Sequence, residues 1–379
     1  MPSTLMSYDA SRRQFLRGLA VMGVGSAVSS LGVSPAAFAA PLGRSDGGLV
    51  HPGALHTDEQ LKAVTAGIAE SADPVAVAWS RLTADPRSSA SWTPTPSAVL
   101  RVGGAASNHH TLLDDTHAAY QNALIWRLGG DEDHARAACR ILGAWSAELR
   151  SVAGQPATYL ASGIHGFLLA NAAELVRDRD DLDTEAFGTM LRDVFLPLNQ
   201  SRLLDEDDGC GSRFGIVWDL AHLASMMSIA VFSDDDALLA QSVDLFDHRP
   251  GAPIANTIPF AHDEGAGQVH SIIATGLAAA VCETAWNQGY DLYSSQGSRL
   301  LASASFVAGT TRDYEHFQNK DRLWGISETG PAWALLHDHY AGRQGVEVST
   351  TLTALADRSR AEGCAVDRLG LGRYAYSLD

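Results

Sequence analysis

Lysine is nearly absent from this chain: Lys62 and Lys320 are its only lysines among 379 residues, so arginine must supply almost all cationic recognition. Acidic residues number 44 against 27 basic ones, and the formal net charge is −17. Residues 1–39 contribute +2, from three arginines and one aspartate, which leaves −19 on the remainder. So acidic a chain is not expected to bind nucleic acid, and a large polyanion would need a local groove lined with arginine.

Cysteine is also scarce, and the spacing of the four cysteines does not resemble a zinc site. Cys139 and Cys282 fall on apolar faces of helical patterns, where buried free thiols are common. Cys210 and Cys364 lie in polar stretches and could pair after export. The sequence has no Gly-x-Ser-x-Gly hydrolase element, phosphate-binding glycine loop or calcium-loop spacing. We therefore expect no metal and no cofactor.

The first 40 residues have the pattern of an export signal. Arg12-Arg13 is followed by the uncharged apolar stretch 18–33 and by Ala37-Phe38-Ala39, a small-x-small cleavage pattern. The stretch has roughly 16 residues, fewer than the ~20 that span a bilayer, so a membrane anchor is the weaker interpretation. We expect a twin-arginine signal over 1–39, read by the twin-arginine export machinery, and a secreted or periplasmic domain over 40–379. No later segment is apolar enough to span a membrane.

The mature chain has the pattern of one amphipathic helix after another. Residues 112–128 carry an apolar stripe, Gly129-Gly130 ends it, and Asp131 begins the next helix. Comparable patterns predict helices over 58–70, 131–149, 158–177, 184–197, 216–232, 235–246, 270–287, 298–310 and 331–341. Only 346–352 and 374–376 are weak strand candidates. Helical hairpins in series predict an all-α fold, as a bundle, a solenoid or a closed ring of helix pairs.

Several longer motifs follow one another over nearly the whole mature chain. They are His51-Pro52-Gly53-x-Leu55-His56-Thr57, the helix pair over 115–149, Trp218-Asp219-Leu220 running into 229–235, the segment 283–293 (ETAWNQGYDLY), and His339-Tyr340 with Leu369-Gly370-Leu371-Gly372 near the end. The segment 283–293 is the most specific of these. Together and in this order, the motifs resemble those of the alginate-lyase-like family of polysaccharide lyases.

This resemblance implies an incomplete (α/α) toroid of helical hairpins, with a cleft lined by residues near helix ends. It also implies β-elimination of a uronate polysaccharide with no required metal. In that reaction Asn, Arg or His neutralises the uronate carboxylate, a base removes the proton at C5, and an acid, often Tyr, protonates the leaving glycosidic oxygen. Each positioned acid or base contributes about 10²–10⁴-fold to the rate.

His270 is the first candidate for the acid or base. It lies thirteen residues before Glu283, where relatives carry a helix-start histidine in the pattern Glu-Ser-x-Arg-Asp-x-x-His-Thr. Ala266 and Gly267 occupy the Arg and Asp positions of that pattern, so the usual bidentate carboxylate clamp is missing there. Gln268, beside it at the same helix start, is a candidate for substrate binding. The alternative is a helix-start histidine with a structural role only.

The helix that carries Trp218 and His222 is the second candidate region. Relatives have Asn-Trp-Asp or Asn-Asn-His here, but Val217 replaces the asparagine and cannot hydrogen-bond a carboxylate. Trp218 is expected to stack on a sugar, although a large apolar residue at helical spacing often packs in the core. His222 follows one turn later on the same face and is a catalytic candidate. Arg213, a few residues earlier, is the candidate that would supply the missing positive charge.

Two further groups of residues are candidates. Asn108, His109 and His110 precede a helix, and helix N-termini bind anions well, although the three could equally be a solvated cap. His165 lies on the helix where relatives contribute cleft residues, and we assign all four to substrate binding. Adjacent histidines point in different directions, which disfavours a metal site. Tyr290, in the most specific motif, is a candidate for the catalytic acid, although that motif also has the pattern of a structural turn.

Three functions are consistent with these residues. The first is a secreted lyase that cleaves a uronate-containing glycan. The second keeps the toroid but acts on a small molecule, as an exported tailoring enzyme performing elimination, dehydration or cyclisation. The third is a non-catalytic glycan-binding relative. The motifs expected to hold the toroid together match the family better than those expected to perform chemistry, and fold alone does not fix function.

Overall fold

The structure is a computed structural model that describes residues 48–154, 157–204, 215–249, 254, 267–311 and 330–369. The expected signal peptide, Cys210, Arg213 and the strand candidate at 374–376 lie outside these residues. Cys139 and Cys282 are buried free thiols, as expected. Cys364 is buried as well, and its pairing with Cys210 stays a prediction.

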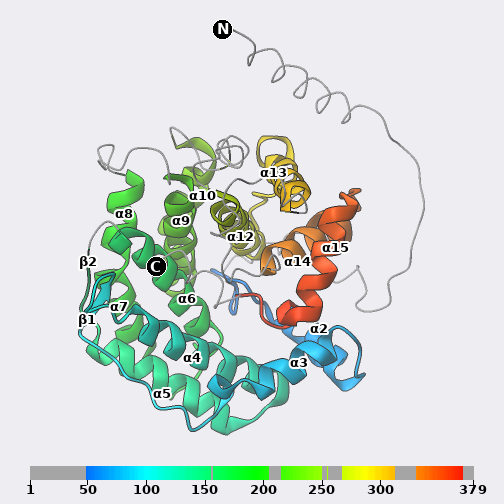
Figure 1. Ribbon diagram of the computed structural model, residues 1–379. Coiled ribbons are helices and arrows are strands. Elements are labelled where there is room, and N and C mark those ends of the chain that lie inside the picture. The colour runs from blue at the N-terminus through cyan, green and yellow to red at the C-terminus, as the bar shows by residue number, and fades with distance from the viewer. Residues whose placement is uncertain are drawn as a thin grey trace. The chain divides into compact units, whose positions relative to one another are not determined.

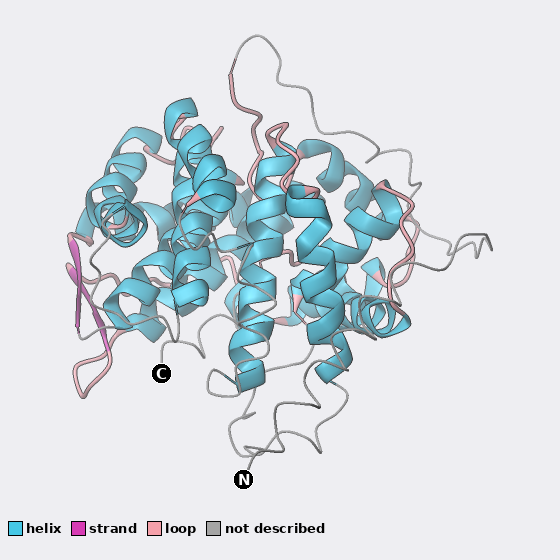
Figure 2. Ribbon diagram, turned by 90° about the horizontal axis from the view of Figure 1, so that it is seen from above, coloured by secondary structure: helices cyan, strands magenta, loops and turns pink. Residues whose placement is uncertain are grey.

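The all-α prediction is confirmed. The helices are α2 (Asp58–Ala69), α3 (Val75–Ala84), the 3₁₀ helix η2 (Pro86–Ser88), α4 (His109–Gly129), α5 (Glu132–Glu148), α6 (Ala157–Glu174), α7 (Thr184–Val194), α8 (Leu196–Leu204), α9 (Gly215–Phe232), α10 (Asp236–His248), α12 (Gly267–Asn287), α13 (Ser295–Thr311), α14 (Pro331–His337), the π-helix η4 (Asp338–Arg343), α15 (Thr350–Ser359) and the π-helix η5 (Arg360–Cys364). Two short parallel strands, β1 (Val99–Val102) and β2 (Ser151–Gly154), pair at one edge (Figure 2). Among the described helices, none combines the length and apolar composition needed to cross a bilayer.

The helices form two rows, as in an (α/α) toroid. Helices α4, α6, α9, α12 and α14 contact one another in this order and form the inner row (Figure 1). Four inner helices also pack against the outer helix that follows them in the chain: α5 on α4, α10 on α9, α13 on α12 and α15 on α14. The remaining outer helices are α8, which packs against α6 and α9, and α7, which packs against α5 and α8. The incomplete (α/α) toroid expected from the motifs is therefore the observed fold.

The direction of the chain places all inner helices in parallel. Short connections join each inner helix to its outer partner, such as Gly130-Asp131 between α4 and α5 and residues 233–235 between α9 and α10. A short connection reverses the chain, so inner and outer helices are antiparallel and the inner helices all run the same way. Their N-termini lie at one end of the toroid, called here the N-terminal end of the inner row, and their C-termini at the opposite end.

Glycine lets two inner helices approach closely. A Cβ atom added to Gly163 of α6 would lie 2.8 Å from the carbonyl carbon of Ala221 and 2.9 Å from the backbone nitrogen of His222, both in α9. Real Cβ atoms do not approach backbone atoms so closely, so only glycine fits at this contact. The pair α6–α9 is the most extensive helix contact of the described residues, and it fixes the centre of the inner row.

The segment that contains His51-Pro52-Gly53 binds the opposite end of the inner row. The Gln288 side chain accepts a hydrogen bond from the backbone N–H of Val50 at 3.0 Å and donates to the backbone oxygens of Val50 and Gly53 at 2.9 Å. Asn287 donates to the backbone oxygen of Ala54 at 2.6 Å. Two of the family-like motifs are therefore partners of each other, and their role here is structural.

Glu283 is the buried centre of this opposite end. Its carboxylate accepts hydrogen bonds from Arg343 at 2.6 and 2.8 Å, from Arg368 at 3.0 Å, from Tyr293 at 2.9 Å and from Gln60 at 3.1 Å. Burial would raise the pKa of Glu283, but the charges and hydrogen bonds of the two arginines outweigh it and lower the pKa to about 2. The carboxylate thus joins α2, α12, η4 and the last described residues, which closes the toroid (Figure 1).

Several local predictions were wrong or incomplete, and helix α3 was not predicted. Residues 346–352 are not a strand: they lead into α15, where the Ser349 hydroxyl accepts a hydrogen bond from the backbone N–H of Leu352 and caps the helix. The helix predicted over 184–197 is two helices, α7 and α8, separated at Phe195. Strands β1 and β2 were not predicted, because each has only four residues and pairs with a segment about fifty positions away.

Candidate functional site

In the part of the chain that the structure describes, the first turns of the inner helices lack acidic residues. None of the inner helices α4, α6, α9, α12 and α14 has an aspartate or glutamate in its first turn. The outer helices α5, α7 and α10 have acidic residues in their first turns, where the helix dipole favours negative charge. First turns without carboxylates leave the positive ends of these helix dipoles available to an anionic ligand.

Three histidines meet where α4 begins. His109 is the first residue of α4, and its ring centroid lies 4.0 Å from that of His110 and 6.1 Å from that of His165 in α6. His110 is exposed, whereas His109 and His165 are buried. The structure therefore brings together three of the candidate substrate-binding residues, in a cluster that extends from the surface into the contact between α4 and α6.

His165 is an unusual residue in this cluster. Its side chain is fully buried, and neither ring nitrogen has a hydrogen-bond partner. Burial, together with the charges of His109 and His110, lowers its pKa to about 3, so the ring is neutral above that pH. An unsatisfied buried polar group costs about 1–3 kcal/mol, and such groups in native proteins often mark functional positions.

Asn108 has a local structural role. Its side-chain oxygen accepts a hydrogen bond from the backbone N–H of Arg101 at 2.6 Å, and its side-chain nitrogen donates to the backbone oxygen of Val99 at 3.0 Å. Both amide atoms are thus bound to β1, and the side chain does not cap α4. The residue holds the start of α4 against β1 and thereby positions His109 and His110.

Trp218 lies in the first turn of α9, beside a pair of arginines. Its ring is half-buried, and the guanidinium carbon of Arg202 lies 5.7 Å from the ring centroid. Arg202 donates to Asp219 at 2.8 Å, and Arg249 donates to the other oxygen of the same carboxylate. Burial raises the pKa of Asp219 despite the two arginines, whose charges lower it. Two guanidinium groups thus share one carboxylate next to Trp218.

His222 faces the outer row and not a surface. Its side chain is fully buried, and its Nδ1 atom lies 2.7 Å from the side-chain oxygen of Asn199 in α8. Asn199 also donates to Ser225 at 2.7 Å, so one asparagine binds both residues of α9. Burial, with the charges of Arg202 and Arg249, lowers the pKa of His222 to about 3. This environment is that of a core histidine and not of a proton donor to substrate.

Only the backbone of His270, the first candidate for the catalytic acid or base, is described. His270 and Gln268 lie in the first turn of α12, the inner helix that packs against α9, and their side chains are outside the described part of the structure. Arg213 is also outside the described residues. The backbone of His270 thus lies at the same end of the inner row as Trp218 and the cluster of His109, His110 and His165. His270 is in the first turn of α12, and Trp218 is in the first turn of the neighbouring helix α9.

Solved structures with this arrangement of helices exist. Alginate lyase A1-III complexed with a tetrasaccharide, in a form with a tyrosine-to-phenylalanine substitution, matches 81% of this chain and 95% of its own with a TM-score of 0.56 at 14% identity. Alginate lyase A1-III from Sphingomonas species A1 matches 82% of this chain and 97% of its own, with a TM-score of 0.56 at 14% identity. Alginate lyase A1-III with a histidine-to-alanine substitution, complexed with a tetrasaccharide, matches 81% of this chain and 91% of its own, with a TM-score of 0.52 at 14% identity. The chain has an alginate-lyase-like fold. No family model and no curated protein matches its sequence.

Tyr290 is far from the other candidates in this alginate-lyase-like fold. It follows the C-terminus of α12, whereas His270 is in the first turn, so the rise of the helix separates them by about 25 Å. Tyr290 is half-buried and packs against the core at the opposite end, near the Glu283 centre. The structure does not bring it together with Trp218 or the histidine cluster, and a shared site with His270 is excluded by the length of the helix.

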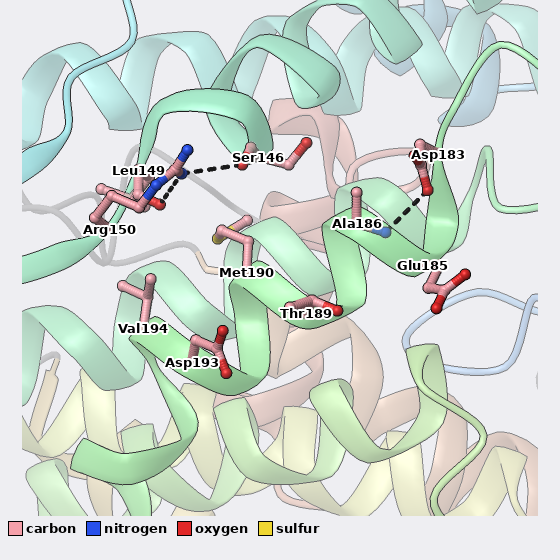
Figure 3. Close-up of a pocket in the computed structure, with 10 residues that line it drawn as sticks. All are labelled: Ser146, Leu149, Arg150, Asp183, Glu185, Ala186, Thr189, Met190, Asp193 and Val194. Atoms are coloured by element: carbon pink, nitrogen blue, oxygen red, sulfur yellow. Dashed lines mark hydrogen bonds between the residues drawn. The ribbon is translucent and has the colours of Figure 1, made fainter.

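An open hollow on the outer row is not part of this site. It lies between the end of α5 and α7 (Figure 3) and is lined by Ser146, Leu149, Arg150, Asp183, Glu185, Ala186, Thr189, Met190, Asp193 and Val194. Arg150 donates to the backbone oxygen of Leu149 at 2.8 Å, and Asp183 accepts from the backbone N–H of Ala186 at 2.9 Å. None of the predicted site residues lines it. In the described residues, no cluster of His, Cys, Asp and Glu has the geometry of a metal site.

Sequence reasoning missed Arg202 and Arg249. Arg202 is near the end of the outer helix α8 and Arg249 directly follows the outer helix α10, so both reach the N-terminal end of the inner row. A buried aspartate in the apolar helix α9 was the available signal, because a buried carboxylate requires a cationic or hydrogen-bonding partner. The partners themselves lie 17 and 30 residues away and have no pattern that identifies them.

Proposed function

We propose that this protein is a secreted polysaccharide lyase, exported by the twin-arginine route, that cleaves a uronate-containing glycan by β-elimination. The proposal rests on one observation above all: in an alginate-lyase-like fold, the inner helices direct N-termini without acidic first-turn residues to one end of the toroid. That end suits the carboxylates of a polyuronate even though the chain as a whole is strongly acidic. Structural neighbours complexed with a tetrasaccharide support a carbohydrate substrate.

The proposed reaction requires three tasks at this end. The substrate carboxylate is neutralised so that the C5 proton becomes acidic, a base takes that proton, and an acid protonates the oxygen that leaves C4 as the C4–C5 double bond forms. No water is consumed. We assign acid–base chemistry to His270, whose backbone lies in the first turn of α12. His109, His110, His165 and Gln268 are assigned to substrate binding, with Trp218 as the stacking surface for a sugar ring.

The distribution of the predicted residues supports this division of tasks. The histidine cluster, Trp218 and the start of α12 belong to neighbouring inner helices at one end. Tyr290 is about 25 Å away along α12, so we do not retain it as the acid. His222 is hydrogen-bonded in the core to Asn199, so we do not retain it as a catalytic group either. Arg213 stays a candidate cation.

The test is the ultraviolet absorbance of unsaturated uronate ends after incubation with alginate, glucuronan and related polymers. We expect absorbance to rise with at least one polyuronate, and the His270→Ala variant to lose about 10²–10⁴-fold in rate while keeping its fold. Saturable glycan binding by well-folded protein without any product would replace this proposal by a glycan-binding function. Neither binding nor product across the panel would leave the small-molecule tailoring function of the sequence analysis.

A further inference from the structure

Both nitrogens of the His51 ring face carboxylates that come from different parts of the chain. Nδ1 lies 2.6 Å from an oxygen of Glu174, the last residue of α6, and Nε2 lies 2.7 Å from an oxygen of Asp234, in the turn between α9 and α10. A neutral imidazole has one N–H group and can donate to only one of these oxygens. The two short distances therefore indicate a protonated ring that donates to both carboxylates.

The charges around His51 balance only while its ring is protonated. Glu174, Asp234 and Arg177 are the charged groups that face it in the described part of the chain. Arg177 donates to the second oxygen of Asp234, and its Nε atom lies 3.7 Å from the second oxygen of Glu174. The side chain of Glu174 is only 2% exposed, and burial raises its pKa although the His51 ring opposes this. This buried carboxylate therefore depends on the positive charge of His51.

His51 holds residues 49–53 against the opposite end of the inner row. The backbone N–H of Gly53 donates to the same Glu174 oxygen at 3.2 Å, and Gln288, directly after α12, binds the backbone of this stretch. The residues that follow it are buried in the core and anchor the chain, whereas the His51 side chain keeps 18% of its surface exposed to water. Residues 49–53 can therefore detach without unpacking the inner row.

We propose that His51 is a pH-operated latch, which in its protonated form fastens residues 49–53 to the C-terminal ends of α6, α9 and α12 and in its neutral form releases them. Loss of the proton leaves one carboxylate without a donor and one negative charge uncompensated beside the buried Glu174. Detachment of residues 49–53 admits water to that carboxylate and relieves the charge. The helices of the inner row stay folded in both states, and the latch does not depend on the proposed lyase function.

The direction of the pH effect follows from the surroundings of the ring. Burial lowers the pKa of His51, but Glu174 and Asp234 outweigh it and raise the pKa above the ordinary value of 6.5. In the detached state the ring lies in water and regains its ordinary pKa. Attachment is thus fully favoured below pH 6.5 and weakens as the pH rises towards the folded-state pKa. Over that window the opening constant should rise by about tenfold per pH unit, because opening releases one proton.

The experiment measures amide hydrogen exchange of the purified protein by mass spectrometry, from below pH 6.5 into alkaline solution. The intrinsic exchange rate at each pH, divided by the observed rate, gives a protection factor for fragments that cover residues 49–53. We expect this factor to be constant below pH 6.5, to fall by about tenfold per pH unit above it, and then to level off. Fragments of α9 should keep their protection.

Replacing His51 removes the titrating group. In His51→Gln, residues 49–53 should be weakly protected at every pH, without the fall above pH 6.5. The matched control is His134→Gln: the side chain of His134 is 19% exposed, close to the 18% of His51, but its Nδ1 atom lies 2.6 Å from the amide oxygen of Asn122. This control should keep the pH dependence of the wild type.

Three results would overturn the latch: a wild-type protection factor that does not change over this pH range, a fall that persists in His51→Gln, or a parallel loss of protection in α9, which would mean unfolding of the inner row. If His51→Gln does not fold, Asp234→Asn decides. Asp234 has a φ of 55°, which asparagine adopts readily. Without its charge the fall should span a narrower pH range, and an unchanged range would contradict a latch between two carboxylates.

Discussion

Replacing Glu283 by glutamine tests how the toroid is closed. The side chain is fully buried, and its two oxygens accept hydrogen bonds from Arg343, Arg368, Tyr293 and Gln60. The substitution keeps the volume but removes the negative charge. One of the two oxygens becomes an amide nitrogen, which faces donors instead of an acceptor. Arg343, with only 3% of its side chain exposed, then has a buried charge without its counterion.

Two lines of reasoning give the same magnitude for this loss. Removing one partner of a buried ion pair destabilises proteins by about 3–5 kcal/mol. Independently, although burial raises the pKa of Glu283, its arginine partners lower it from 4.5 to about 2, and a shift of that size corresponds to about 3 kcal/mol. We therefore expect Glu283→Gln to lower the free energy of unfolding by about 3–5 kcal/mol at neutral pH.

Urea unfolding followed by circular dichroism measures this quantity by linear extrapolation. Because the folded-state pKa of Glu283 is depressed, its contribution is complete above pH 4.5 and is lost as the pH falls towards 2. The difference between wild type and variant should shrink over that window. Glu347 is exposed, and Glu347→Gln is the control, expected to change stability by less than about 0.5 kcal/mol. A loss below about 1 kcal/mol for Glu283→Gln, with no pH dependence, would refute this account of the closure.

Two further substitutions test the packing of the inner row and the ion pairs of His51. Gly163→Ala should lower the free energy of unfolding by about 1–3 kcal/mol, because the added Cβ would meet Ala221 of α9. Gly143→Ala, in α5 with open space around it, is the control and should raise the free energy of unfolding by about 1 kcal/mol. Equal effects of the two substitutions in thermal melts would contradict the close approach of α6 and α9. Burial lowers the pKa of His51, but hydrogen bonds to Glu174 at 2.6 Å and to an aspartate carboxylate outweigh it and raise the pKa. The stability that His51 contributes is thus present below pH 6.5 and is lost as the pH rises through the folded-state pKa of His51. His51→Gln should therefore lower the free energy of unfolding just below pH 6.5 and leave it nearly unchanged in alkaline solution. A difference in urea unfolding that does not depend on pH would argue against this ion pair.

The helical framework could be predicted because its signals are local. Gly130, at a φ of 78°, ends the pattern of α4, and the Asp131 side chain accepts a hydrogen bond from the backbone N–H of Asp133 and caps α5, as the sequence indicated. Where local signals were weak, tertiary contacts decided. Ser349 caps α15 in a stretch whose β-branched residues suggested a strand.

The candidate site was predictable only in part, because its contacts are long-range. His109 and His165 are 56 positions apart. The helix start indicated His109 and the resemblance indicated His165, and the structure brings their ring centroids to 6.1 Å from each other. The pairing of Asp219 with Arg249 has no sequence signal of its own, since any buried carboxylate can recruit an arginine from a neighbouring outer helix. His222 shows the converse: helical spacing put it on the face of Trp218, but only the structure shows that Asn199 binds it in the core.

The most direct test of the central claim is the fate of the glycosidic bond in water enriched in heavy oxygen. A well-folded wild-type protein is incubated with the best-bound oligouronate, and the products are analysed by mass spectrometry. Elimination predicts fragments that contain no heavy oxygen, whose masses sum to that of the substrate, with a new double bond at one end. Incorporation of heavy oxygen into the products would mean hydrolysis, and it would contradict the proposal that this end of the inner row performs β-elimination.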